Sequence, residues 1–181
     1  MRYRLIDSPV GPLTLAVNGD GVLCGVYAEG QKYYPDAAAL GVRDDAVAED
    51  AVVQLTGYFA GVRTAFDLPL APRGTAFQRR VWQALTGIPA GETRSYGEIA
   101  AALGSPGASR AVGAATGRNP ISIIVPCHRL VGASGSLTGY AGGIERKRWL
   151  LDHEAAGVQR EGVLMREDGH AGAGGDPERI A

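Results

Sequence analysis

The chain has 181 residues and a net charge of −1; 45% of its residues are hydrophobic and 20% are charged, a balance typical of globular proteins with a buried core. It has no apolar run of about eighteen residues and no basic start followed by an apolar stretch, which argues against a membrane span or secretory signal and leads us to expect a cytoplasmic protein. Two cysteines and three histidines are too few for a disulfide framework or a structural zinc site, so we expect free thiols, no metal and no cofactor.

Basic residues are concentrated in the middle of the chain. Residues 75–154 hold nine Lys and Arg against five Asp and Glu, a net charge of +4, while residues 1–74 and 155–181 carry −3 and −2. This segment permits an anionic partner such as DNA, but a solvated surface also explains it.

The first part of the chain predicts a small sheet with one helix. Apolar residues alternate around 3–5, 13–17 and 22–27, and Gly, Pro and Asn-Gly turns separate the runs, so we expect antiparallel strands joined by hairpins. Cys24 lies inside the third run, where a buried, inert thiol is expected. Residues 46–60 have apolar positions at helical spacing. Residues 1–70 are therefore predicted to form an α/β (α+β) domain with an antiparallel sheet.

A proline-containing connector at 67–74 separates this part from a mainly helical domain predicted over residues 75–156. Its first helix follows Thr75 as N-cap, and its second follows Ser95, which with Glu98 has the spacing of a capping box. A short turn then leads to a third helix over 108–117. The last two helices form either a DNA-binding helix-turn-helix or a simple packed helical hairpin.

The helix over 108–117 has one face for packing and one nearly bare face. We expect the packing face to contain Ala108, Ala111, Val112 and Ala115, and the opposite face to contain Arg110, Gly113, Ala114 and Gly117. The bare face lacks the several polar side chains that read base edges in the major groove. It suits close approach to a narrow surface, or close helix packing within the protein.

The remaining segments surround the sequence Pro126-Cys127-His128-Arg129. An aliphatic run at 121–125 is predicted to be a core strand, and a glycine-rich segment covers 132–143. Residues 144–156 are predicted to form a helix in which Arg146, Lys147 and Arg148 are solvated. Residues 157–181, rich in Gly, Ala and charges, are predicted to be a flexible tail.

Cys127 and His128 are candidates for nucleophilic chemistry, because a thiol attacks as its thiolate and an imidazole is a common means of activating it. Neighbouring side chains in an extended segment point to opposite faces, so a working pair requires a turn or a bridging water. The alternative is a buried thiol beside a hydrogen-bonded ring.

Several motifs together resemble the O6-alkylguanine-DNA alkyltransferase family. They are RGTAFQRRVWQAL, IPAGETRSYGEIA, ASRAVGAATGRNP and the long stretch NPISIIVPCHRLVGASGSLTGYAGGIERKRWLLDHE, in order over residues 74–154. The resemblance implies repair of double-stranded DNA by direct transfer of the alkyl group from O6-alkylguanine, and from O4-alkylthymine, to Cys127. We also expect a monomer that does not associate with membranes.

The family pattern implies a role for each matching residue. Cys127 would be the alkyl acceptor, His128 would take its proton through a water, Glu154 would orient the imidazole, and Tyr96 would donate to the departing guanine. Asn119 would tie the helix-turn-helix to the reactive turn. Arg110 would fill the gap left by a nucleotide flipped out through the minor groove. The remaining positions implied for DNA or base binding are Ala108, Gly113, Ala114, Leu130, Tyr140, Ala141, Gly142 and Gly143.

One position departs from the pattern. Many members of the family have Ser after the pocket tyrosine, whereas Ala141 follows Tyr140 here, which leaves only a backbone group to contact the base. The thioether product has no leaving group and no second thiol is expected nearby, so we expect one turnover per chain.

Two other functions are alternatives to DNA repair by alkyl transfer. One is a non-catalytic DNA-binding module that flags lesions. The other is a thiol hydrolase, which would turn over acyl substrates.

Overall fold

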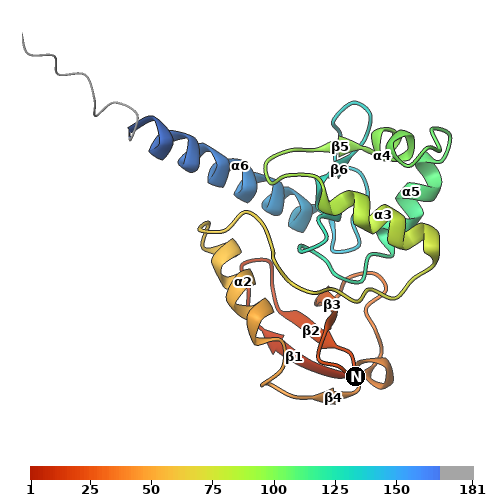
Figure 1. The fold of residues 1–181 in the computed structure, drawn as a ribbon, viewed down its shortest axis with the longest axis vertical. Helices are drawn as coiled ribbons and strands as arrows, with labels where there is room; N and C mark the ends of the chain where they lie inside the picture. The colour runs from red at the N-terminus through yellow and green to blue at the C-terminus, as the bar shows by residue number, and fades with distance from the viewer. Residues whose placement is uncertain (168–181) are drawn as a thin grey trace, which may run out of the picture.

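The computed structural model describes residues 1–167, and its N-terminal part is a sheet lobe (residues 1–59). The lobe contains a four-stranded sheet in the order β3-β2-β1-β4 and two helices (Figure 1). Its elements are β1 (Arg2–Ile6), β2 (Leu13–Val17), β3 (Leu23–Ala28), α1 (Ala37–Leu40), β4 (Val42–Arg43) and α2 (Glu49–Phe59). The three expected strands and the expected helix are confirmed, as is the α/β class.

The expectation of a purely antiparallel sheet is wrong at one edge. β1 and β2, and β2 and β3, are antiparallel, but β4 runs parallel to β1, with Arg2 opposite Val42. The chain returns through α1 before it reaches this edge, so β4 enters in the same direction as β1. Two residues are too few to show an alternating pattern, so this strand could not be predicted from periodicity.

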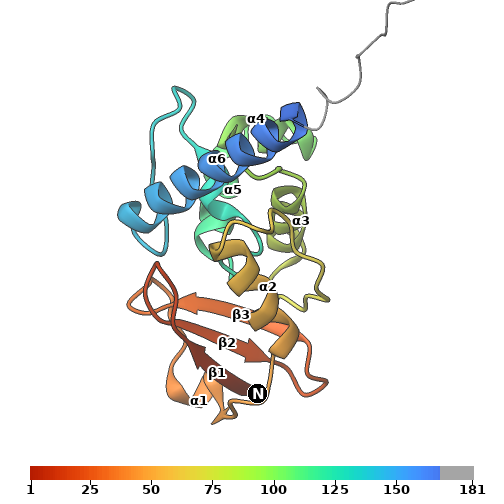
Figure 2. The same ribbon diagram turned by 90° about the vertical axis from the view of Figure 1, so that its left-hand side faces the viewer.

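α2 packs on the sheet and lies between it and the helices of the second lobe (Figure 2). All five residues of β2 are buried: Leu13, Leu15 and Val17 face the main core, while Ala16 faces a small second cluster with Cys24. Leu55 of α2 is also fully buried in the main core. This cluster continues into the second lobe, so the two lobes share one hydrophobic core.

The helical lobe (residues 76–167) follows the connector. Thr75 and Ser95 each cap a helix with the reciprocal bonds of a capping box, as the sequence predicts. α4 and α5 pack against each other and against α3, which gives the predicted helix-turn-helix arrangement (Figure 1). The elements are α3 (Ala76–Thr86), β5 (Arg94–Ser95), α4 (Tyr96–Ala102), α5 (Ser109–Gly117), the 3₁₀ turn η1 (Cys127–Arg129), β6 (Leu130–Val131) and α6 (Ile144–Glu167).

The aliphatic run at 121–125 is buried but is not a strand, so that expectation is wrong. Ile121 makes a single parallel bridge to Val26 at the edge of β3, and the chain then turns at Ile123, whose φ of 74° lies in the left-handed region. A bridge to β3 satisfies only part of the backbone, and the turn is needed to bring Cys127 back toward α6. The run is apolar because it lies in the shared core.

Two further expectations need correction. In α5, Ala111 is exposed and Thr116 is buried in its place, so the packing face is Ala108, Val112, Ala115 and Thr116. The indole of Trp82 in α3 donates to the carbonyl of Ala115 at 2.9 Å, and this bond orients α5.

α6 continues to Glu167, into the segment predicted to be a flexible tail; residues 168–181 of that segment lie outside the described residues. Over residues 1–167, none of the helices has the length and apolar character needed to cross a bilayer.

Candidate active site

The reactive turn is held in place by Asn119. The side-chain amide of Asn119 donates to the carbonyl of Val125 at 2.9 Å, and its oxygen accepts from the backbone N–H of Ile121 at 3.0 Å. The same amide nitrogen lies 3.1 Å from Sγ of Cys127. Asn119 therefore joins the end of the helix-turn-helix to the turn, as the family pattern implies, and it also contacts the thiol directly.

His128 is fully buried and bonded to Glu154. Its Nε2 lies 2.8 Å from Oε1 of Glu154, across 26 positions of sequence. Burial alone would raise the pKa of Glu154, but hydrogen bonds from His128 and Arg129 outweigh it and hold the pKa well below its usual range. An ionised carboxylate only accepts hydrogen bonds, which assigns the hydrogen of neutral His128 to Nε2. Nδ1 is then a lone pair, and this buried atom has no hydrogen-bond partner among the described residues.

The thiol of Cys127 is protonated in the resting protein. Cys127 is only 4% exposed, and burial raises the pKa of its thiol; the Asn119 amide and the charge of Lys147 offset part of that rise. Burial also lowers the pKa of His128 more than Glu154 raises it. The resting state is thus a neutral thiol and a neutral imidazole, and formation of the thiolate requires a proton acceptor.

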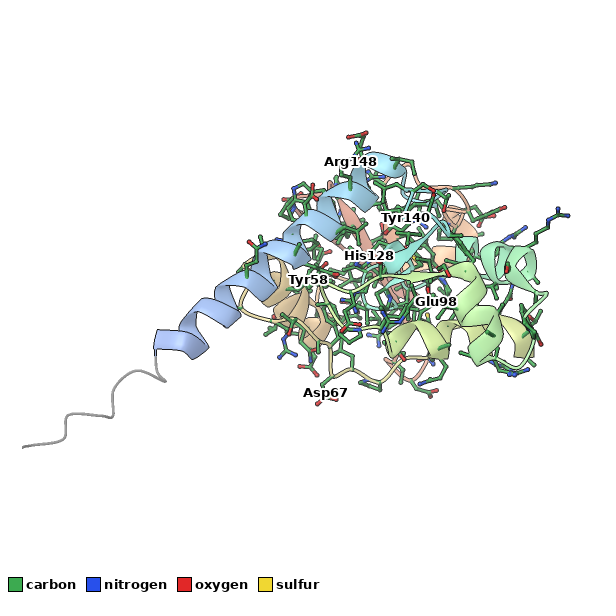
Figure 3. All side chains as sticks on the ribbon, turned by 90° about the horizontal axis from the view of Figure 1, so that it is seen from above. Tyr58, Asp67, Glu98, His128, Tyr140 and Arg148 are labelled. Atoms are coloured by element: carbon green, nitrogen blue, oxygen red, sulfur yellow. The ribbon has the colours of Figure 1, made fainter. Side chains whose placement is uncertain are left out.

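Glu154 has two further side-chain partners that the sequence analysis missed. Arg129 donates to both carboxylate oxygens, from Nη2 to Oε1 at 2.8 Å and from Nε to Oε2 at 2.9 Å, and the hydroxyl of Tyr58 in α2 donates to Oε1 at 2.8 Å. Figure 3 shows Tyr58 and His128 beside α6, which carries Glu154 (Figure 3). Arg129 is part of the Pro-Cys-His-Arg tetrad, so a role for it at the site could have been predicted. Nothing near Tyr58 in the sequence indicated its contact with Glu154.

Lys147 is buried rather than solvated, contrary to our expectation. Its ammonium group donates to the carbonyl of Leu130 and, at 3.0 Å, to that of Thr138. Burial lowers the pKa of Lys147 while the nearby Cys127 raises it. Three charged residues follow one another from Arg146 to Arg148, and only the packing of α6 decides which of them faces inward. A buried cation close to the sulfur favours its thiolate form.

Four of the residues implied for DNA and base binding, Gly113, Ala114, Tyr140 and Ala141, lie on two sides of a groove of about 290 Å³. α5 contributes Gly113, Ala114 and Gly117, and the segment after the reactive turn contributes Gly139, Tyr140 and Ala141. The sheet lobe adds Lys32 and Tyr33, which the sequence analysis did not name. Tyr33 has a φ of 62°, and the guanidinium of Arg118 stacks over its ring at 3.9 Å. Strain of this kind is tolerated only where the surrounding structure fixes it.

The other implied residues are not in the lining of this groove. Tyr96 is half-buried beside Gly113, and its hydroxyl accepts from Oγ1 of Thr138 at 3.0 Å. Burial raises the pKa of Tyr140 well above its usual value. Gly142 and Gly143 continue the Tyr140 segment into α6. Arg110 is exposed on α5, whereas Ala108 packs against the core.

Comparisons with known proteins match both parts of the chain. The family described as "6-O-methylguanine DNA methyltransferase, DNA binding domain" matches residues 76–156, and the family described as "6-O-methylguanine DNA methyltransferase, ribonuclease-like domain" matches residues 1–72. The methylated-DNA--protein-cysteine methyltransferase of Mycobacterium bovis is 58% identical over 154 residues, which cover 85% of this chain and 92% of that protein. The protein of the same name from Methanosarcina acetivorans is 49% identical over 158 residues, which cover 86% and 99%.

Solved structures agree with the sequence comparisons. The crystal structure of Mycobacterium tuberculosis OGT in complex with DNA has a TM-score of 0.81 and 56% identity, over 87% of this chain and 94% of that chain. The crystal structure of Mycobacterium tuberculosis O6-methylguanine methyltransferase has a TM-score of 0.81 and 55% identity, over 91% and 98%. The resemblance read from the motifs is confirmed. The chain belongs to the 6-O-methylguanine DNA methyltransferase family.

Proposed function

We propose that this protein repairs DNA by moving the alkyl group of O6-alkylguanine, or of O4-alkylthymine, directly to Cys127. The observation that carries the proposal is a pair of buried contacts at the reactive turn. The amide nitrogen of Asn119 lies 3.1 Å from Sγ of Cys127, and Nε2 of His128 lies 2.8 Å from Oε1 of Glu154. A thiol held in this way has a defined direction of attack and a defined base.

The chemical step is a displacement at the alkyl carbon. His128 Nδ1 takes the thiol proton through a water, because Nδ1 is the free lone pair and Nε2 is held by Glu154. The bond from Sγ of Cys127 to the alkyl carbon forms as the bond from that carbon to O6 of guanine breaks. Tyr96 supplies a hydrogen bond or proton to the departing guanine.

The product is a thioether on Cys127, and the chain works once. Cys24, the other cysteine, lies in the sheet lobe in a separate buried cluster with Ala16 and Leu40, so no second thiol is placed to remove the alkyl group. Because a thioether offers no good leaving group, the transfer is irreversible. The protein is consumed as a reagent.

The groove beside α5 supports binding from the minor groove with the damaged base flipped out. A face of Gly113, Ala114 and Gly117 allows close backbone approach, and Arg110 on the exposed side of α5 would occupy the space of the extruded nucleotide. The base pocket would be formed by the carbonyls of Cys127 and Leu130 together with residues 140–143. The carbonyl of Leu130 already accepts from Lys147 but has a second lone pair.

We also propose that residues 1–70 and 75–156 form two domains, and that alkyl transfer and DNA binding both belong to the second. All groups of the proposed site come from one chain, which supports action as a monomer on double-stranded DNA. The free thiol of Cys127 must stay reduced to react, which supports a cytoplasmic location.

Intact mass spectrometry tests the proposal. After incubation with a duplex containing one O6-methylguanine, the wild-type chain should gain one methyl group, Cys127→Ala should gain none, and Cys24→Ala should behave like the wild type. A protein that binds the lesion without gaining mass would be the non-catalytic module instead. Repeated turnover on an acyl ester would indicate a thiol hydrolase.

A further inference from the structure

Gly139, Tyr140 and Ala141 line the open groove. Tyr140 also packs against the core cluster, where burial raises the pKa of its phenol, and it lies near enough to Cys127 for a charge on the sulfur to raise that pKa further. The segment 139–143 therefore borders both the groove and the surroundings of the thiol. How far this segment can move would then decide how large an alkyl group can reach the sulfur.

The sheet lobe holds this segment by a backbone hydrogen bond. The N–H of Lys32 donates to the carbonyl of Ala141 at 2.9 Å. Within the segment, the N–H of Gly143 donates to the carbonyl of Tyr140 at 2.9 Å, which closes a turn. The ring of Tyr140 lies over Gly142 so closely that a Cβ there would come within 2.7 Å of it. The turn is thus compact and fixed at its centre.

The side chain of Arg146 also fixes the segment 139–143, and it connects that segment to two other parts of the chain. Its Nη1 donates to the carbonyl of Gly142 at 3.1 Å, its Nε to that of Val10 at 2.8 Å, and its Nη2 to that of Glu29 at 2.8 Å. Val10 and Glu29 belong to loops of the sheet lobe, whereas Gly142 belongs to the segment that lines the groove. Among residues 1–157, Arg146 has no carboxylate within salt-bridge distance, and its hydrogen bonds go to these backbone carbonyls.

We propose that Arg146 is a positioning residue that restricts the size of the alkyl group accepted by Cys127. Its planar guanidinium ties the carbonyl of Gly142 to two loops of the sheet lobe, and this keeps Tyr140 and Ala141 close to the approach to the sulfur. The inference rests on the proposed function. It gives the sheet lobe a role in selecting the lesion, although none of its residues takes part in the transfer.

Rates of transfer from two adducts in one duplex test this. The duplex carries either O6-methylguanine or O6-benzylguanine at the same position, and single-turnover rates are measured for the wild type, Arg146→Ala, Arg146→Lys and Arg148→Ala. Arg148 is the matched control, since it is exposed on α6 with only a surface contact to Glu145 and points outward in Figure 3 (Figure 3). We expect Arg146→Ala to raise the ratio of the benzyl to the methyl rate about tenfold, Arg146→Lys to raise it less, and Arg148→Ala to leave it unchanged.

The ratio of the benzyl to the methyl rate distinguishes a positioning role of Arg146 from a general loss of stability. If Arg146→Ala lowers both rates by the same factor, Arg146 is only structural and the inference is wrong. If Arg146→Ala does not fold, Arg146→Lys decides, because a lysine keeps the charge but cannot make the same fork of bonds. Hydrogen exchange of the amide of Gly143 should also be faster in either variant, and unchanged exchange would count against the inference. A wild-type chain that takes no methyl group from the duplex would overturn the proposed function instead.

Discussion

Tyr58 and Glu154 lie 96 positions apart in sequence and meet in a buried hydrogen bond of 2.8 Å between the phenol and the carboxylate. Tyr58 belongs to α2 of the sheet lobe, and Glu154 belongs to α6 of the helical lobe. The carbonyl of Tyr58 also lies 2.7 Å from Nε2 of His153. Glu154, the hydrogen-bond partner of His128, is thus held in part by the sheet lobe.

Replacing Tyr58 by Phe should reduce stability more than an ordinary hydroxyl deletion. A hydrogen bond to a charged group contributes about 1.5–3 kcal/mol, and the buried carboxylate of Glu154 would lose one donor. Urea unfolding measures the loss. Tyr34→Phe is the control, because the hydroxyl of Tyr34 is bonded only to the neutral hydroxyl of Thr14 at 2.6 Å. Equal losses in the two variants would show that the charge of Glu154 is not stabilised by Tyr58.

Replacing Asn119 by Ala should slow transfer at neutral pH by about tenfold or more, which corresponds to about 1.4 kcal/mol. The variant removes the donor that lowers the pKa of the Cys127 thiol and also releases the turn at Val125. The midpoint of the pH–rate profile should therefore move to higher pH. Rates measured from about pH 6 to 10.5 decide this, because burial already raises the pKa of the wild-type thiol. A slower variant with an unmoved midpoint would limit Asn119 to holding the turn.

Acid should weaken the wild type through Glu154. The pKa of Glu154 is lower in the folded protein than the value of about 4.3 in an unfolded chain. The unfolded state therefore binds more protons in this range, so the stabilisation is complete above the unfolded pKa and is lost as pH falls below it. Urea unfolding between about pH 6 and 3 should show a steeper fall for the wild type than for Glu154→Gln. Parallel curves would contradict the low pKa.

Arg110 should matter for duplex DNA and not for the free base. It is exposed on α5 and touches no group of the reactive turn, so Arg110→Ala should slow transfer from duplex O6-methylguanine much more than transfer from free O6-methylguanine. Single-turnover rates on both substrates provide the comparison. A similar loss on each would refute its role in filling the gap left by the flipped nucleotide.

Local signals in the sequence predicted the helices of the site well. Thr75 and Ser95 mark helix starts because their side chains bond to backbone groups only three residues away. The Pro-Cys-His-Arg tetrad located the reactive turn for a similar reason, since its residues act together within one short segment. Interactions of this range are visible in any window of the chain.

Long-range contacts could not be read in the same way. Tyr58 and Lys147 are each buried against groups outside their own segments, and nothing in those segments separates them from ordinary helix or surface residues. Arg129 is marked by the tetrad, but its contact with Glu154, 25 positions away, is not. Ala111 shows that the packing face of a single helix is also hard to predict. The helical spacing allowed either Ala111 or Thr116 on the packing face of α5, and only the contacts with the neighbouring helices decided between them.

The backbone bonds between β3 and residues 120–122 have a consequence for aggregation. Val26 donates to the carbonyl of Pro120 at 2.9 Å and accepts from the N–H of Ser122 at 3.0 Å, and Leu23 accepts from Ala71 at 2.8 Å. The β3 edge of the sheet is therefore already paired, and it offers few free groups to a strand of another molecule. The stretch that leads to Cys127 also shields this edge, so substitutions that loosen it should cost solubility together with activity.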